Sequence, residues 1–247
     1  MRLVRAEFLK LRKRRGLAAA VIALTIAPVV VGFTVLSVLH AVDPKRYDPA
    51  GGFENLQGSL ELLTQIGVVG AILVGATVGA ADRGSGVFRE LVVTGRSRLQ
   101  LFAARIPGGL AFVLPLVALS FAIAVVASIT FTGTGQEPVT GETIVRYAGW
   151  VSLDMILAFL LALGVSSALG SRGTSIGILL AWQLAAAPLL LATGKLDSVL
   201  PNAALASLQP EPTQVVSTSL PTAIVVLAFW MLAPLAIGAW QTSTADA

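Results

Sequence analysis

Long apolar runs separated by short charged segments dominate the sequence. Five of these runs contain no Asp, Glu, Lys or Arg, and a sixth contains only Asp154. Each can hold about 20 helical residues at a rise of about 1.5 Å, enough to cross a hydrocarbon core of roughly 30 Å. The runs are Gly16–Val42, Leu62–Ala81, Ile106–Gln136, Tyr147–Ser171, Gly173–Gly194 and Pro212–Trp240. The pattern therefore predicts an all-α polytopic membrane protein with six transmembrane helices.

Composition supports this prediction and limits the chemistry. Charged residues make up 12% of the chain and hydrophobic residues 55%, whereas a soluble domain has about 25% charged residues. Six helices use most of the 247 residues, so we expect a single membrane domain over 1–247 with no further soluble domain. The sequence has no cysteine and one histidine, His40, which removes disulfides, thiol nucleophiles and multi-histidine metal sites. We therefore expect no catalytic, cofactor-binding or metal site in this chain.

The distribution of Lys and Arg predicts the orientation of the helices. Thirteen basic residues fall before the first run, between the second and third, and between the fourth and fifth, whereas four fall in the other connections. Cytoplasmic loops carry the excess of Lys and Arg, so both termini are predicted to be cytoplasmic, with segments 42–61 and 137–146 outside. The net charge is +4, and the basic residues flank apolar runs without interleaved aromatic residues. This arrangement indicates a lipid membrane rather than a nucleic acid as partner.

Residues 1–15 have the pattern of an amphipathic helix. Val4, Phe8 and Leu11 recur at spacings of four and three residues, while basic residues occupy the remaining faces. Such a helix is typical of an anionic bilayer surface. Two roles stay open: an anchor that sets orientation, and a docking surface with Glu7 as its acidic contact. The candidate residues of this interface helix are Glu7, Phe8, Leu11 and Arg12.

The segment 82–105, between the second and third runs, is predicted to contain two helices. Phe88, Leu91 and Val92 lie on one face of a first, short helix that a glycine ends. Ser97 and Gln100 have the spacing of a capping box, which predicts a second helix continuing into the third span. A charged, folded helix parallel to the membrane indicates a partner contact, and a solvated linker is the alternative.

Asp154 is the one charged residue inside the six runs. It lies about seven residues, or roughly 10 Å, from the start of the fourth run. An ionised group at that depth is costly unless it faces protein or water, so we expect it to line a cavity or to pair two helices. A shallow position, from which the carboxylate reaches the lipid headgroups, is the alternative.

The segment 195–220, before the last run, carries a short apolar element of its own. Its residues from Pro201 to Leu208 could form two helical turns beginning at an Asn202 cap and ended by Pro210 and Pro212. A helix too short to span the bilayer is typical of a re-entrant or interfacial element. An ordinary surface loop is the alternative.

Small residues recur every four positions in the second and fifth runs. The two stripes are Gly67, Ala71, Gly75 and Gly79, and Gly173, Gly177, Ala181 and Ala185. A stripe of this kind lets another backbone approach closely in lipid. Both helices should therefore pack inside the bundle or against a second chain, and the spacing does not separate these two possibilities.

These features together resemble one transporter family. The basic amino-terminal helix ending Lys-Leu-Arg-Lys-Arg-Arg, the loop Asp82–Arg98, the six spans and the long segment before the last span are similar to the permease subunit of ATP-binding-cassette exporters of the ABC-2 type. The resemblance implies a coupling helix at Ser85–Thr94 that docks in a separate ATPase subunit, and a segment Pro201–Leu208 that re-enters the membrane from outside. It also implies a second permease copy or paralogue, and a location in the bacterial cytoplasmic membrane. The residues so implied to couple to the ATPase are Ser85, Val87, Phe88, Arg89, Glu90, Leu91, Val92, Arg96 and Arg98.

The chain is not expected to hydrolyse ATP itself. A phosphate-binding loop needs Gly-x-x-x-x-Gly-Lys-Ser/Thr, and the only Gly-Lys pair, Gly194-Lys195, is followed by Leu196. ATP and Mg²⁺ are therefore expected in the partner ATPase, and this chain is expected not to be an enzyme. An amphipathic or hydrophobic compound, such as a drug, an antibiotic, a natural product or a lipid-like molecule, fits the nearly uncharged interior as the exported substrate.

Two functions of other classes compete with this interpretation. A secondary transporter driven by an ion gradient predicts several buried ionisable groups and often repeated halves, but only Asp154 is clearly embedded and no repeat is evident. A non-transporting membrane scaffold or immunity protein would need no ATPase. A stable complex with an ATPase whose hydrolysis depends on this chain would separate the exporter from both.

Overall fold

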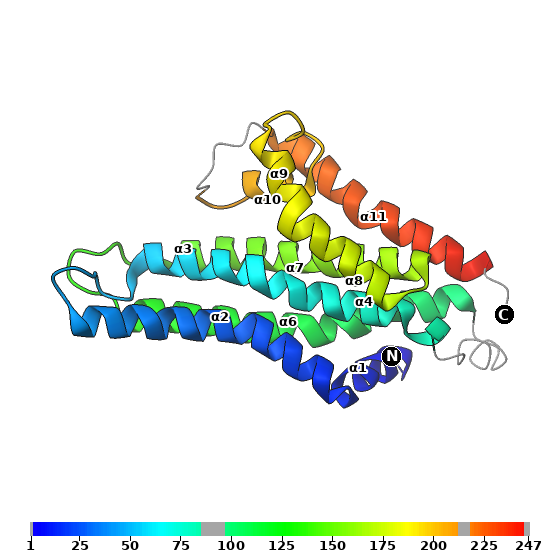
Figure 1. Cartoon of the computed structure of the whole chain (residues 1–247), viewed down its shortest axis with the longest axis horizontal. Coiled ribbons are helices and arrows are strands. Elements are labelled where there is room, and N and C mark those ends of the chain that lie inside the picture. Colours follow the sequence, from blue (N-terminus) through cyan, green and yellow to red (C-terminus); the bar gives the residue numbers. More distant parts are fainter. Residues whose placement is uncertain (1, 85–96, 212–217, 245–247) are drawn as a thin grey trace.

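The computed structural model describes residues 2–84, 97–211 and 218–244, and all of the regular structure in these ranges is helical (Figure 1). Within them, six helices are long and apolar enough to cross a membrane. These spans are Arg15–Val42, Gly52–Ala80, Arg98–Thr130, Gly141–Leu169, Arg172–Ala192 and Leu220–Thr244. The prediction of an all-helical chain with six candidate spans is confirmed.

The amino-terminal helix α1 (Arg2–Lys13) is separate from the first span, α2 (Arg15–Val42), and the chain bends between them at Arg14. The apolar face of α1 packs on α6 (Arg98–Thr130). Leu11 is buried, and the ring centroid of Phe8 lies 6.3 Å from that of Phe112 in α6. The amphipathic face predicted from the sequence therefore contacts protein in this structure.

The second span is one continuous helical rod made of α3 (Gly52–Leu62), the π-helical turn η1 (Leu63–Gly67) and α4 (Val68–Gly84). The rod begins ten residues before the uncharged run, so the connection after α2 is shorter than the predicted segment 42–61. The uncharged run identified the apolar part of the helix but not its first three turns, which contain Glu54 and Glu61. Gly52, with φ 84°, makes the turn into α3 because its backbone conformation suits a residue without a Cβ.

The main core lies between α2, α4, α6 and α7 (Gly141–Leu169). The most extensive helix–helix contact is the seam between α4 and α7. A Cβ added at Gly75 would clash with the backbone oxygen of Phe159, and one added at Gly79 would lie 2.6 Å from the backbone oxygen of Leu163. The small-residue stripe of the second span therefore packs inside the bundle. This is one of the two predicted possibilities, the other being contact with a second chain.

The third span begins as the sequence predicted. Ser97 is the N-cap of α6, and its Oγ accepts a hydrogen bond from the Gln100 backbone N–H at 3.2 Å. The helix then runs without a break to Thr130. The capping-box spacing thus predicted both the start and the continuity of this helix.

The fifth span is divided into α8 (Arg172–Ala181), the π-helical turn η2 (Trp182–Ala186) and α9 (Ala187–Ala192). The wide turn ends at Ala186, two residues before Pro188, whose ring would clash with the carbonyl four residues earlier in a regular α-helix. Gly173 and Gly177 face open space within the described residues. The second small-residue stripe is therefore not packed inside this chain.

A short helix, α10 (Pro201–Ser207), precedes the last span, α11 (Leu220–Thr244). The predicted cap was wrong: Leu200 is the N-cap of α10 and Pro201 its first residue, because proline suits a position whose N–H has no helical acceptor. Figure 1 shows α8, α9 and α11 slanting away from the rods formed by α2, α4, α6 and α7, with α10 beside α9.

Candidate functional site

The slant of α11 opens a wedge between the last two spans and the rest of the bundle. At the closed end of the wedge α11 crosses α7, where a Cβ added at Gly238 would lie 2.8 Å from the backbone oxygen of Gly164. Toward the other end, Figure 1 shows α8–α9 and α11 diverging from α7, and α10 packs with α7 and α11 beside α9. The wedge is thus defined by α7, α9, α10 and α11.

Two indole N–H groups hold α10 and the residues before it in the wedge. Trp150 Nε1 in α7 donates to the backbone oxygen of Leu205 at 2.9 Å, and Trp230 Nε1 in α11 donates to that of Val199 at 2.9 Å. Trp182 of η2 stacks on Trp230 with 5.6 Å between ring centroids. Tryptophans from three different spans therefore border this short helix.

A cavity of about 230 Å³ lies beneath α10 and is lined on several sides by polar groups. Its walls come from α3 and η1, from α7, from η2, and from α10 and the residues after it. The polar side chains on these walls include Glu61, Thr64, Asp154, Gln183, Asn202 and Gln209. Polar side chains from four separate parts of the chain thus line one cavity.

Asp154 lies on the wall of this cavity and is 8% exposed. It also lines a second, narrow cavity of about 30 Å³, whose other walls are mainly apolar side chains of α4, α7 and α8. Among the described residues, none donates a hydrogen bond to the Asp154 carboxylate or forms an ion pair with it. Because α7 begins six residues before the apolar run, Asp154 is about 20 Å along the helix rather than near its start.

The other carboxylate of the cavity, Glu61, has neutral partners. Its Oε1 accepts hydrogen bonds from Gln209 Nε2 at 3.1 Å and from Gln57 Nε2 at 3.3 Å. On the far wall, Asn202 Nδ2 donates to Gln183 Oε1 at 3.4 Å. Amide groups therefore surround the two carboxylates, and no Lys, Arg or His of the described ranges lines either cavity.

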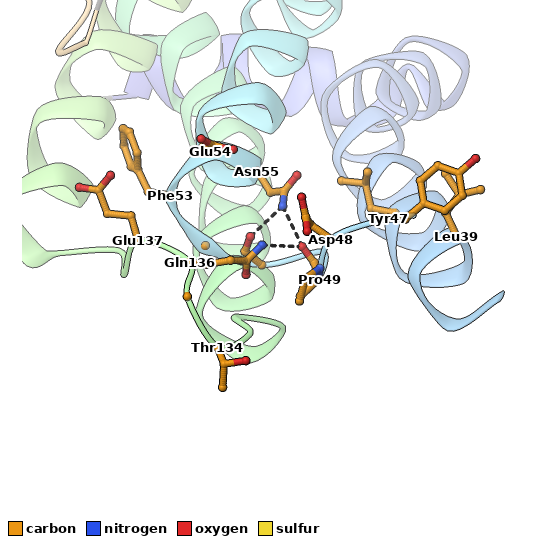
Figure 2. Close-up of a pocket in the computed structure, with 14 residues that line it drawn as sticks. Leu39, Tyr47, Asp48, Pro49, Phe53, Glu54, Asn55, Thr134, Gln136 and Glu137 are labelled. Atoms are coloured by element: carbon orange, nitrogen blue, oxygen red, sulfur yellow. Dashed lines mark hydrogen bonds between the residues drawn. The ribbon is translucent and has the colours of Figure 1, made fainter. Parts of the chain in front are cut away.

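A larger pocket, of about 500 Å³, lies where the connection between α2 and α3 meets the one between α6 and α7 (Figure 2). Asn55 Nδ2 donates to the backbone oxygens of Gly51 at 2.7 Å and Pro49 at 3.1 Å, and Gln136 Nε2 donates to that of Pro49 at 2.8 Å. These bonds, drawn as dashed lines in Figure 2, tie the two connections together. The three carboxylates that border the pocket, Asp48, Glu54 and Glu137, are exposed, so we assign it a structural role.

Of the nine residues predicted to couple to the ATPase, only Arg98 lies within the described part of the chain. Eight of them, Ser85, Val87, Phe88, Arg89, Glu90, Leu91, Val92 and Arg96, lie outside the described residues. Arg98 is described, and its Nη1 donates to the backbone oxygen of Ser243 at 3.1 Å, which joins the start of α6 to the end of α11. The end of α11 and the start of α6 therefore lie at the same end of the bundle.

The interface-helix residues lie close by, where α1 packs on α6. Glu7 forms an ion pair of 2.6 Å with Lys10 and lies against Gly108 of α6, where an added Cβ would be 2.6 Å from the Glu7 Cβ. Arg12 is exposed. Phe8 and Leu11 face α6, as described above, so three of the four candidates meet this helix.

Comparison with known families decides the class of the protein. A family model described as ABC-2 family transporter protein matches residues 3–188, well over half of the chain. The chain belongs to the ABC-2 family of transporter proteins. A comparison with curated proteins found no match.

Membership of the ABC-2 family indicates the general role of the chain. It is a multi-pass membrane component of a transporter, from a family whose membrane domains have no ATPase activity and generally pair with an ABC ATPase. The matched residues end at Pro188, before α10 and α11. The family match therefore does not describe the far wall of the Asp154 cavity.

The cavity walls of this ABC-2 protein were largely missed by sequence reasoning. The sequence pattern indicates Asp154, the one charged residue in an apolar run, as a candidate. Gln183, a lone amide in the fifth run, was a comparable signal. Outside the cavity, Arg105 is one of the thirteen basic residues that predict orientation, yet it is 2% exposed and its Nη1 donates to the Gly79 backbone oxygen at 3.4 Å.

Proposed function

We propose that this chain is the membrane permease subunit of an ATP-driven exporter in the bacterial cytoplasmic membrane. In this proposal it moves an amphipathic or hydrophobic compound outward, together with a separate ATPase that binds ATP and Mg²⁺ and with a second permease copy or paralogue. The observation that carries the proposal is the family match over residues 3–188 on a chain with six candidate spans. The absence of a phosphate-binding loop from the sequence supports a separate source of energy.

The proposed orientation puts α1, segment 82–105, Arg172 and the end of α11 in the cytoplasm. The thirteen-to-four distribution of basic residues supports it. In the same orientation α10 is a re-entrant element reached from outside, and Ser85–Thr94 is the coupling helix that docks in the ATPase. Phe88, Leu91 and Val92 carry the docking contact, because a two-turn helix cannot bury all three by itself.

Orientation is tested with single cysteines, since the chain has none of its own. A membrane-impermeant maleimide added to intact cells should label Asp48→Cys and not Ser243→Cys. Permeabilised cells should label both, which controls for accessibility. Labelling of Ser243→Cys in intact cells would reverse the proposed orientation.

The function is tested by reconstituting the chain with its co-purifying cassette ATPase in proteoliposomes. Transport and substrate-stimulated hydrolysis should both be lost when the phosphate-binding lysine of the ATPase is replaced. Transport that survives this replacement and follows an imposed ion gradient would identify a secondary transporter instead. A chain that binds no ATPase and transports nothing would fit the scaffold or immunity alternative.

A further inference from the structure

The strongest unexplained feature of the molecule is the buried, unpaired carboxylate of Asp154. An ionised carboxylate removed from water is costly unless an opposite charge or several donors compensate it. Within the described part of the chain, the residues lining its two cavities include no cationic side chain and no donor bonded to it. A polar cavity of about 230 Å³ can also hold water, so the partner that enters from outside the chain is water, a proton or a cationic group.

The rest of the larger cavity favours a cationic group over a proton alone. A proton on Asp154 needs no space, whereas about 230 Å³ is present beside it. A second carboxylate, Glu61 of α3, lines the same cavity, and its Oε1 is held by two amides rather than neutralised by a cation. Two carboxylates facing one small space attract positive charge.

The aromatic wall is also suited to a cation. Trp150 borders the cavity, and its only donor is already used by the Leu205 backbone oxygen at 2.9 Å. An indole that lines a cavity can bind an ammonium or quaternary ammonium group through the face of its ring. The carboxylate and the aromatic ring are both contributed by α7, one turn apart, so they hold a fixed geometry.

We propose that this cavity recognises the positively charged amine of an amphipathic substrate, with Asp154 as the counter-ion and Trp150 as an aromatic wall. Pockets for whole drug-sized ligands measure about 300–1,000 Å³, so a cavity of about 230 Å³ accepts one group of the ligand rather than all of it. The apolar remainder of the ligand lies along the wedge or in lipid. The assignment of this ligand as cargo rests on the proposed function, whereas cation binding does not.

The test uses the full-length chain without ATPase, in nanodiscs of zwitterionic phosphatidylcholine so that the lipid adds no net charge. Radiolabelled phenyltrimethylammonium, a permanent cation, is the probe, and tert-butylbenzene, its neutral isostere, is the competitor. The wild-type chain should bind the cation saturably, and the neutral isostere should compete at least about tenfold more weakly than unlabelled cation. Equal competition by the isostere, or no saturable binding, would overturn the proposal.

Substitutions locate the site. Asp154→Asn keeps the shape, removes the charge and should weaken binding at least about tenfold, while Asp154→Glu should retain part of it. Glu142→Gln makes the same charge change on an exposed residue of α7, whose side chain is 79% exposed, and should bind as wild type does. Wild-type affinity of a folded Asp154→Asn variant contradicts the proposal. If that variant does not fold, a failure of Asp154→Glu to bind more weakly than Glu142→Gln contradicts it instead.

The two proposals can fail separately. Cation binding that depends on Asp154 without any ATP-driven efflux would keep the site and remove the exporter function. ATP-driven efflux of quaternary amines that is equal in wild type and in Asp154→Asn would keep the exporter function and remove this site.

Discussion

The seam between α4 and α7 and the wedge around α10 are built in opposite ways. In the seam, glycines bring two backbones together so closely that an added methyl group would clash. In the wedge, spans diverge, and the space between them is occupied by a short helix, tryptophans and two cavities. In the most apolar stretch of the second span 67% of the residues are buried in this chain, against 17% in the corresponding stretches of the fifth and sixth spans.

The difference assigns separate tasks to the two regions. Close backbone packing has one arrangement and tolerates little change in volume, so the seam is suited to moving as a rigid unit. Beyond the tight crossing of α7 and α11 at Gly164 and Gly238, the wedge contains two cavities and is held by side-chain hydrogen bonds, so that part of it is suited to opening and closing around a ligand. The α4–α7 seam is also adjacent in sequence to the proposed coupling segment, because α4 ends at Gly84.

The largest effect should come from breaking the seam. Gly75→Ala places a Cβ against the backbone oxygen of Phe159, and neither backbone can move away without shifting a whole helix. We expect a loss of about 3 kcal/mol or more in stability, larger than usual overpacking because the obstacle is main chain. The measurement is the fraction of monodisperse protein after heating, by gel filtration in detergent.

The matched control is Gly177→Ala in α8, where nothing lies within 4 Å of the added Cβ. It should be neutral or should stabilise the chain by up to about 1 kcal/mol, because alanine favours a helix more than glycine does. Equal heat sensitivity of both variants would remove the distinction between the seam and the fifth span.

The next largest effect should come from weakening the contact between the proposed coupling helix and the ATPase. Phe88→Ala should weaken the complex with the ATPase by about 2 kcal/mol, since an aromatic residue in a partner pocket is a typical hot spot. Arg89→Ala should change mainly the rate of association and its dependence on salt. Co-purification of the ATPase with each variant, and with Leu91→Asp, measures the difference after gel filtration has shown that each variant folds.

Full complex formation and substrate-stimulated hydrolysis in both Phe88→Ala and Leu91→Asp would make segment 85–96 a linker. The rigid α4–α7 unit would then need another point of attachment to the ATPase. The α1–α6 surface, with Glu7, would be the next region to test.

A smaller effect should loosen only the wedge. Trp150→Phe removes the hydrogen bond to the Leu205 backbone oxygen and should cost about 1 kcal/mol. Because α10 loses this indole donor and keeps only the Trp230 bond to Val199 before it, a cysteine at the buried position of Ala204 should react faster with a maleimide. Trp240→Phe, at a residue that is 63% exposed, is the control and should leave that rate unchanged. An unchanged rate in Trp150→Phe would mean that this bond does not hold α10.

The features predictable from the sequence were those encoded within one helix. The six spans follow from apolar runs, α1 from a period of three to four residues, and the start of α6 from Ser97 and Gln100. The wedge depends instead on contacts between distant residues, such as Trp150 with Leu205 and Gln209 with Glu61, 55 and 148 residues apart. No local pattern encodes such pairs, which is why Asp154 could be singled out but its surroundings could not.

The smallest effect should come from replacing Asn202, for which the sequence and the structure indicate different roles. As the N-cap predicted from the sequence, Asn202→Ala would cost about 1 kcal/mol of helix stability. In the structure Leu200 is the cap, and the Asn202 side chain makes a hydrogen bond of 3.4 Å to Gln183 Oε1, long for a bond that contributes much. We therefore expect Asn202→Ala to change thermal stability by less than about 0.5 kcal/mol, and reactivity of a cysteine at Ala204 should stay close to wild type. A loss of about 1 kcal/mol with faster cysteine labelling would instead show that the Asn202–Gln183 bond holds α10 against the fifth span. That bond would then stabilise the wedge as much as the bond from Trp150 does.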